Sequence, residues 1–194
     1  MTLFEFLMMI AAVVIAIGLT EIIGGWGRML RTNASIKFDW LLAGWSVFVL
    51  LWLVLYWLGM WSLNAVEIKF QAQVLFLIFP TLFGVLAAYA MTPDVPRSGE
   101  LDLRAYYIQK RTSIFGPLVV FSVVAPLADY VLVGFDRVGL WIGLLSSGFF
   151  FCTTLTLAIT RQVWVHIIGL CLSLLIIAAF YFGEISALTN RWAS

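Results

Sequence analysis

Six long runs of hydrophobic residues follow one another along the chain, separated by short segments that carry charged residues, glycine or proline. A helix needs about 20 mostly apolar residues to cross the hydrocarbon layer of a membrane. Within that layer each backbone amide must be paired, and a helix pairs its amides inside a single run. The pattern therefore predicts an all-α, polytopic membrane protein, a compact bundle of six transmembrane helices over residues 3–30, 40–61, 67–91, 103–133, 136–160 and 163–189.

The composition supports this prediction, because hydrophobic residues make up 63% and charged residues 11% of the 194 positions. Soluble domains usually have about 25% charged residues, so this chain cannot build a water-exposed surface of ordinary size. Residues 1–194 are expected to form one transmembrane domain. The first run has no basic segment before it and no small-residue cleavage pattern after it, so we expect it to be kept as the first span.

The basic residues divide unequally between the two sides of the predicted bundle. Connectors one–two, three–four and five–six and the helix ends beside them carry Arg28, Arg31, Lys37, Arg97, Arg104, Lys110, Arg111 and Arg161. The other side carries Lys69, Arg137 and Arg191. Because basic residues near span ends favour the cytoplasmic side, we expect a multi-pass protein of the cell inner (plasma) membrane with both termini on the non-cytoplasmic side.

Charged residues inside the apolar runs are the candidate functional residues, because a charge in the membrane needs a partner. Glu21 precedes Arg28 by seven residues, which places the two side chains on nearly one face of the first helix. His166, the single histidine, is expected in the same leaflet. Glu21, Arg28 and His166 form the predicted inner polar site. A Glu21–His166 pair would either relay protons or make a structural hydrogen bond between the first and sixth spans.

A second polar site is predicted near the other membrane surface. Asp129 follows Pro126 in the fourth span, and Glu184 lies seven residues before Arg191 in the sixth. The two carboxylates either converge on an entry site for a cation or proton, or reach the headgroups independently.

Small residues recur at four-residue spacing in the last two spans, including Gly143 and Ser147 in the fifth and Gly169 and Ser173 in the sixth. Small residues let helices approach closely in lipid. This spacing predicts a tight hairpin of the fifth and sixth spans.

Several chemistries find no support in the sequence. It contains no HExxH motif, no Cys/His cluster and no glycine-rich phosphate loop after a strand. We therefore expect no catalytic residue, metal or cofactor, and an enzyme is disfavoured. The net charge of +1 gives no attraction to nucleic acid. The expected partners are membrane lipid and either further copies of the chain, in a homo-oligomer, or another membrane protein.

Two functions fit this architecture. The first is transport, by a small channel or transporter for an ion, proton or small solute, which would use the intramembrane polar sites. The second is a non-transporting role as a sensor, an assembly factor or a subunit of a larger membrane complex. The near absence of extramembrane domains motivates the second hypothesis.

Overall fold

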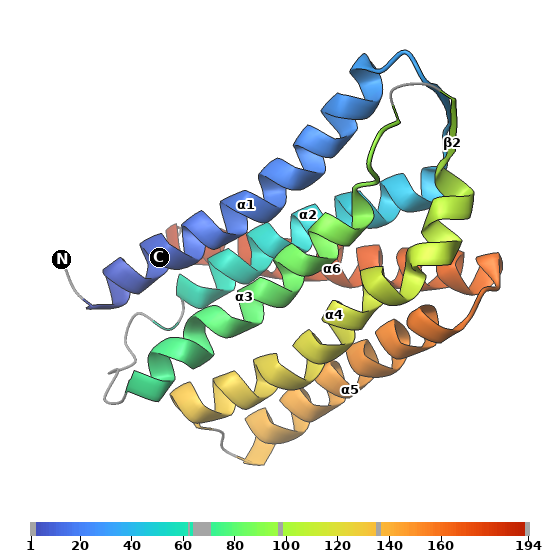
Figure 1. The fold of residues 1–194 in the computed structure, drawn as a ribbon. Helices are drawn as coiled ribbons and strands as arrows, with labels where there is room; N and C mark the ends of the chain where they lie inside the picture. Colours follow the sequence, from blue (N-terminus) through green and yellow to red (C-terminus); the bar gives the residue numbers. More distant parts are fainter. Residues whose placement is uncertain (1–2, 62, 64–70, 97–98, 135–136, 193–194) are drawn as a thin grey trace.

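The computed structural model describes residues 3–61, 63, 71–96, 99–134 and 137–192. In this part of the chain the elements are α1 (Leu3–Arg31), β1 (Ser35–Lys37), α2 (Trp40–Met60), α3 (Gln71–Met91), β2 (Glu100–Asp102), α4 (Leu103–Val133), α5 (Arg137–Ile159) and α6 (Val163–Trp192) (Figure 1). Each hydrophobic run corresponds to one helix. Residues 67–70 of the third predicted span and residue 136 of the fifth lie outside the described residues.

Four of the helices are long and apolar enough to cross a membrane: α1, α2, the segment Val74–Met91 of α3 and the segment Leu103–Leu132 of α4. The apolar segments described in α5 and α6, Gly143–Ile159 and Val163–Ala179, are each shorter than 18 residues. The structure therefore indicates an all-helical, membrane-embedded protein with four helices of spanning length. It does not confirm the prediction of six spans.

Two short strands were not predicted. β1 and β2 lie in the connectors α1–α2 and α3–α4 and pair in parallel, with Ile36 opposite Leu101. Three residues are too few to show an alternating pattern, and the pairing depends on a partner far along the chain. We call the end of the bundle that carries β1 and β2 the strand end; the α5–α6 connector lies at the same end (Figure 1).

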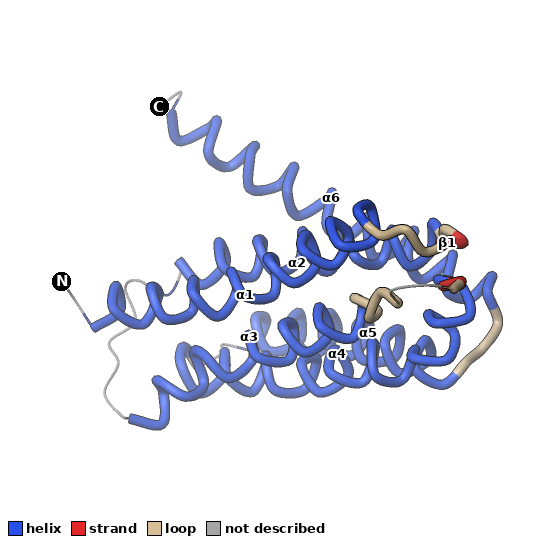
Figure 2. The backbone as a smooth tube through the Cα atoms, turned by 45° about the horizontal axis from the view of Figure 1, so that its top comes forward, coloured by secondary structure: helices blue, strands red, loops and turns tan. Residues whose placement is uncertain are grey.

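The helices pack mainly in the order α1–α3–α4–α5, with α3 between α1 and α4 and with α5 against α4. α2 contacts α1, α3 and α6. Beyond its first turns, α6 diverges from the other helices (Figure 2). Gly169 of α6 lies against Leu157 of α5, but a groove separates the two helices along their outer face. The tight hairpin predicted from the small residues is therefore not formed.

A cluster of four rings packs in the interior near the strand end. Trp45 of α2 packs edge-on against Phe115 of α4, with ring centroids 4.9 Å apart. Tyr107 and His166 contact the same phenylalanine at centroid distances of 6.2 and 5.7 Å. All four side chains are at most 1% exposed, so this part of the interior is occupied by close-packed rings.

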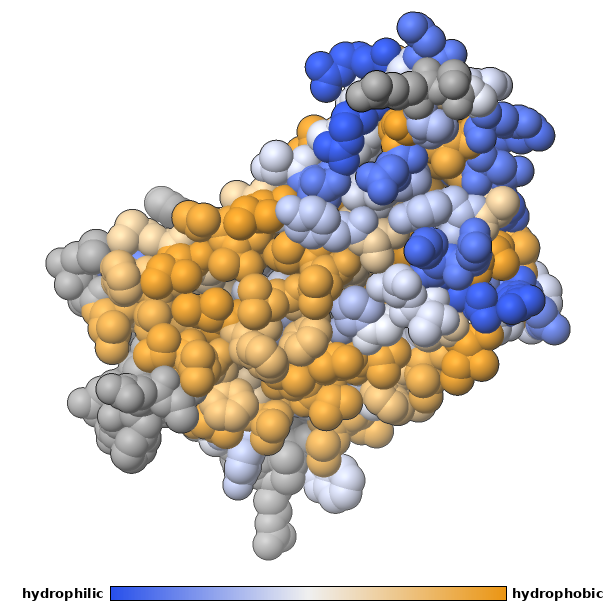
Figure 3. Space-filling model, viewed as in Figure 1, coloured by the Kyte–Doolittle hydropathy of each residue, from blue (hydrophilic) through white to orange (hydrophobic). Residues whose placement is uncertain are grey.

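Hydrophilic residues gather at the strand end, whereas most of the remaining described surface on the face in Figure 3 is hydrophobic. Large apolar side chains point outward from the helices, including Val13, Leu75, Val123, Leu145 and Leu175. A surface of this kind matches the hydrocarbon of a bilayer, whereas a soluble protein rarely exposes so large an apolar area.

Candidate functional site

Three groups of polar contacts lie at or near the strand end, and together they join helices α1 to α6. The first is centred on Glu21, the second on Asp39 and the third on His166. Each connects segments that are distant in the sequence.

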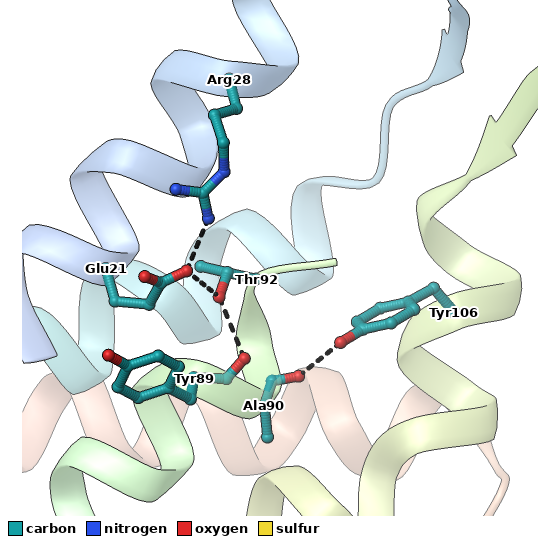
Figure 4. A network of polar contacts seen from close by, with 6 residues as sticks. All are labelled: Glu21, Arg28, Tyr89, Ala90, Thr92 and Tyr106. Atoms are coloured by element: carbon teal, nitrogen blue, oxygen red, sulfur yellow. Dashed lines mark hydrogen bonds and ion pairs between the residues drawn. The ribbon is translucent and has the colours of Figure 1, made fainter. Parts of the chain in front are cut away.

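Glu21 binds two partners from different helices. Its Oε1 atom lies 2.6 Å from Nη2 of Arg28, in a salt bridge along α1. The Thr92 hydroxyl, at the end of α3, lies 3.0 Å from the same Oε1 and 3.0 Å from the carbonyl oxygen of Tyr89. The single proton of the Thr92 hydroxyl can be donated to either of these two acceptors. Figure 4 shows the Arg28 and Thr92 side chains converging on Glu21. The group ties α1 to α3.

Gly25 makes this contact between α1 and α3 possible. A Cβ atom at Gly25 would lie 2.5 Å from Cγ2 and 2.8 Å from Cβ of Thr92. Nonbonded carbon atoms normally stay about 3.5–4.0 Å apart, so a side chain at this position would push the two helices apart. Glycine at 25 thus brings the Thr92 hydroxyl within reach of Glu21.

Asp39 has two roles. Its carboxylate accepts hydrogen bonds at 3.4 Å from the backbone amides of Leu41 and Leu42, which caps the first turn of α2. It also binds Arg104 of α4, with Oδ1 2.8 Å from Nε and 2.6 Å from Nη2. Asp39 is only 2% exposed, so its charge depends on these donors. The carboxylate therefore fixes the start of α2 against the start of α4.

A third ion pair lies on the strands themselves. Nζ of Lys37 is 2.7 Å from Oε1 of Glu100, and both side chains are exposed. The hydrogen bond and the negative charge of Glu100 raise the pKa of Lys37. The contribution to stability is small because solvent screens exposed pairs.

His166 is completely buried and links α4, α5 and α6. Its Nδ1 atom is 2.6 Å from the Tyr107 hydroxyl, and its Nε2 atom is 3.1 Å from the carbonyl oxygen of Thr160. A carbonyl can only accept, so Nε2 carries the proton and donates it to Thr160. Nδ1 then accepts from Tyr107. Both nitrogens of a neutral ring are thereby satisfied.

The end of α5 is held by further donors from α4. Thr112 donates to the carbonyl oxygen of Ala158 at 3.1 Å, and Nε of Arg111 donates to that of Ile159 at 3.4 Å. Carbonyls at a helix C-terminus have no partner within the helix. With Thr160 bound by His166, three successive carbonyls are thus paired at the α5–α6 connector.

The structure brings together only part of the predicted inner site. Glu21 and Arg28, which their spacing placed on nearly one face of the first helix, form a salt bridge. His166, however, binds Tyr107 and Thr160 and makes no hydrogen bond to Glu21. The side-chain partner of His166 therefore comes from α4, and not from the first span as predicted.

The predicted outer site is described in part. Asp129 is exposed on the surface of α4. Glu184 belongs to α6, but its side chain lies outside the described residues. A shared site of these two carboxylates therefore stays a prediction.

Several site residues were missed from the sequence. The Asp39-Trp40 pair has a recognisable signal, since an aspartate directly before an apolar run is typical of a helix N-cap. Thr92, Arg104 and Tyr107 carry no such signal. Their roles follow only from which helices become neighbours.

Among the described residues, no three His, Cys, Asp or Glu side chains are grouped so that they could hold a metal ion. Cys152 and Cys171 are free and exposed. The contacts of the polar groups at the strand end indicate that these groups link helices.

The groove between α5 and α6 is the other notable feature. It has a volume of about 250 Å³ and is open toward the outside of the bundle. Its lining is mostly apolar but includes Cys152, Thr153 and Thr156 of α5. Thr156 donates to the carbonyl oxygen of Cys152, as hydroxyls on helices commonly do.

Comparison of the chain with protein-family models, with curated proteins and with solved structures finds no match.

Proposed function

We propose that all six helices cross the bilayer of a bacterial-type inner membrane, with both termini on the non-cytoplasmic side. At about 1.5 Å per residue, the 23 residues of α5 and the 30 of α6 are long enough for a hydrocarbon layer of about 30 Å. The basic side chains described at the strand end support a cytoplasmic position for that end. They are Arg28, Arg31, Lys37, Arg104, Lys110, Arg111 and Arg161.

Within this membrane we propose a non-transporting role, as a subunit or assembly factor that binds another membrane protein. The observation that carries the proposal is the ring cluster of Trp45, Tyr107, Phe115 and His166, which packs in the interior near the strand end with side chains that are at most 1% exposed. A conducting path through this part of the interior would need these rings to separate. Packed interiors resist such rearrangement.

The pairing of the charges supports the same role. Glu21, Asp39 and His166 each bind partners within the chain. In these positions they hold helices together, as buried polar groups in membranes commonly do. The α5–α6 groove is the surface where a helix of the partner protein would lie.

The test is purification of the full chain from its native membrane in mild detergent, combined with cross-linking from single-cysteine variants. Cys152 lines the groove, and Cys171 is exposed on α6 without lining it. We expect one stoichiometric protein partner and a cross-link from Cys152. Cys171 serves as the matched control. The proposal would be refuted if the chain were recovered alone or only as a homo-oligomer and if Cys152 and Cys171 gave equal cross-linking.

Transport is the second candidate. The observation that favours it is the position of Glu21, whose side chain is still 20% exposed and lies seven residues before the interfacial Arg28. In liposomes, a transporter would give ion or proton flux that Glu21→Gln abolishes. Flux of this kind would replace the non-transporting proposal, whereas its absence across common ions would agree with it.

A further inference from the structure

Two arginines at the end of α1 have side chains that fold back toward the middle of the helix. Arg28 reaches Glu21, seven residues earlier, through Nη2 (Figure 4). Arg31 donates from Nε to the carbonyl oxygen of Gly27 at 3.0 Å. Side chains on a helix lean toward its N-terminus. On α1 that direction leads away from the strand end and toward the apolar part of the bundle.

Glycines provide the surface on which these side chains lie. A Cβ atom at Gly24 would be 3.5 Å from Nη1 of Arg28, and one at Gly27 would be 3.6 Å from Nη2 of Arg31. Each guanidinium group therefore lies close to bare backbone one turn before its own residue. Residues three apart are neighbours on a helix surface, so Gly24 and Gly27, against which the two guanidinium groups lie, are adjacent on α1.

Most of the donors on these groups make no hydrogen bond to another described residue. A guanidinium has five N–H donors. Among the described residues, Arg28 uses only Nη2 and Arg31 uses only Nε for hydrogen bonds. The Arg28 side chain is 50% exposed. Glu21 neutralises one of the two positive charges, which leaves the group with one positive charge in excess.

We propose that Arg28 and Arg31 bind the phosphodiester group of an anionic phospholipid in the leaflet at the strand end. Guanidinium groups match the oxygens of a phosphate in geometry and in charge. A headgroup with one negative charge neutralises the single excess positive charge, which favours an anionic lipid over a zwitterionic one. Glu21 acts as a positioning residue, because it holds Arg28 over the glycines. The inference rests on the proposed insertion of α1 in a bilayer.

The experiment uses the full chain, purified in detergent and freed of lipid. Native mass spectrometry measures the bound lipid during titration with phosphatidylglycerol, with phosphatidylethanolamine and with sodium phosphate. Arg31→Gln is the test variant because it leaves the Glu21–Arg28 pair intact. Arg161→Gln is the matched control, since Arg161 is exposed at the same end of the bundle. Circular dichroism confirms that both variants are folded.

We expect the protein to prefer phosphatidylglycerol and Arg31→Gln to bind it about tenfold more weakly, as the loss of a charge-assisted contact implies. Arg161→Gln should bind within about twofold of the unchanged protein, as expected for a charge outside the site. An equal loss in both variants would show general attraction to a basic surface and overturn the site. Equal binding of the two lipids would overturn its selectivity. Displacement of the lipid by millimolar phosphate would make the ligand a free anion.

Discussion

The contact between Gly25 and Thr92 permits a sharp test, because Gly24 is adjacent in the same helix and lacks the contact. An alanine at 25 would place its Cβ 2.5 Å from Cγ2 of Thr92, whereas one at 24 would meet only Nη1 of Arg28, at 3.5 Å. The first distance is a severe overlap and the second is an ordinary contact. The two substitutions add the same methyl group to the same helix.

The expected magnitude follows from this comparison. Replacing a helical glycine by alanine gains about 0.5–1 kcal/mol, and this term is common to both variants. The overlap at Gly25 costs about 1–3 kcal/mol, the usual range for an overfilled interior. Thr92 cannot turn away freely, because rotation would move its hydroxyl away from both available acceptors, Glu21 and the Tyr89 carbonyl. We therefore expect Gly25→Ala to be less stable than Gly24→Ala by about 1–3 kcal/mol.

The assay is unfolding of the purified protein in increasing SDS, followed by tryptophan fluorescence. A Thr92→Ser change supplies a further control, because it removes Cγ2 and keeps the hydroxyl. Combined with Gly25→Ala, it should restore part of the lost stability, since the Cβ of residue 92 still lies 2.8 Å away. Equal stabilities of the two alanine variants, or no recovery in the double variant, would refute the close approach of α1 and α3.

Three further predictions follow from the strand-end contacts and the proposed topology. Arg104→Gln should destabilise the protein by about 1–3 kcal/mol, because the buried Asp39 carboxylate loses its charged hydrogen-bond partner. Adding Asp39→Asn should recover stability in the same SDS assay, and a further loss would contradict the pairing. Tyr107→Phe should cost about 1–3 kcal/mol because it leaves Nδ1 of His166 unsatisfied. Tyr106→Phe is the control, because it removes a hydrogen bond from a half-buried ring to the Ala90 carbonyl. Thermal unfolding should show a smaller loss of stability for Tyr106→Phe than for Tyr107→Phe. The reverse order would refute the buried contact between Tyr107 and His166. Alkaline phosphatase fused to either terminus should be active, as expected for two non-cytoplasmic ends, and an inactive fusion at one end would contradict the even number of spans.

The positions of the helices were largely predictable from the sequence. The hydrophobic runs are long, and a helix satisfies its backbone locally, so each run specifies its own structure. The Glu21–Arg28 pair was predictable for the same reason, since both residues lie on one helix and the spacing sets their faces.

Contacts between helices were not predictable in the same way. The partner of His166 depends on whether α1 or α4 lies beside α6, and the apolar pattern is compatible with either. The Asp39–Arg104 pair likewise requires two connectors to meet. Membrane helices are apolar on nearly every side, so their hydrophobic pattern carries little information about which face meets which neighbour.

The parallel pairing of β1 with β2 has a consequence for the order of assembly during synthesis. Ser35 is synthesised before its strand partner Glu100, and Asp39 is synthesised before Arg104. Until the start of α4 has been synthesised, the backbone of β1 lacks its strand partner, and Asp39 caps α2 without the positive charge of Arg104. The connector between α1 and α2 can therefore complete its contacts only after the start of α4 has been synthesised.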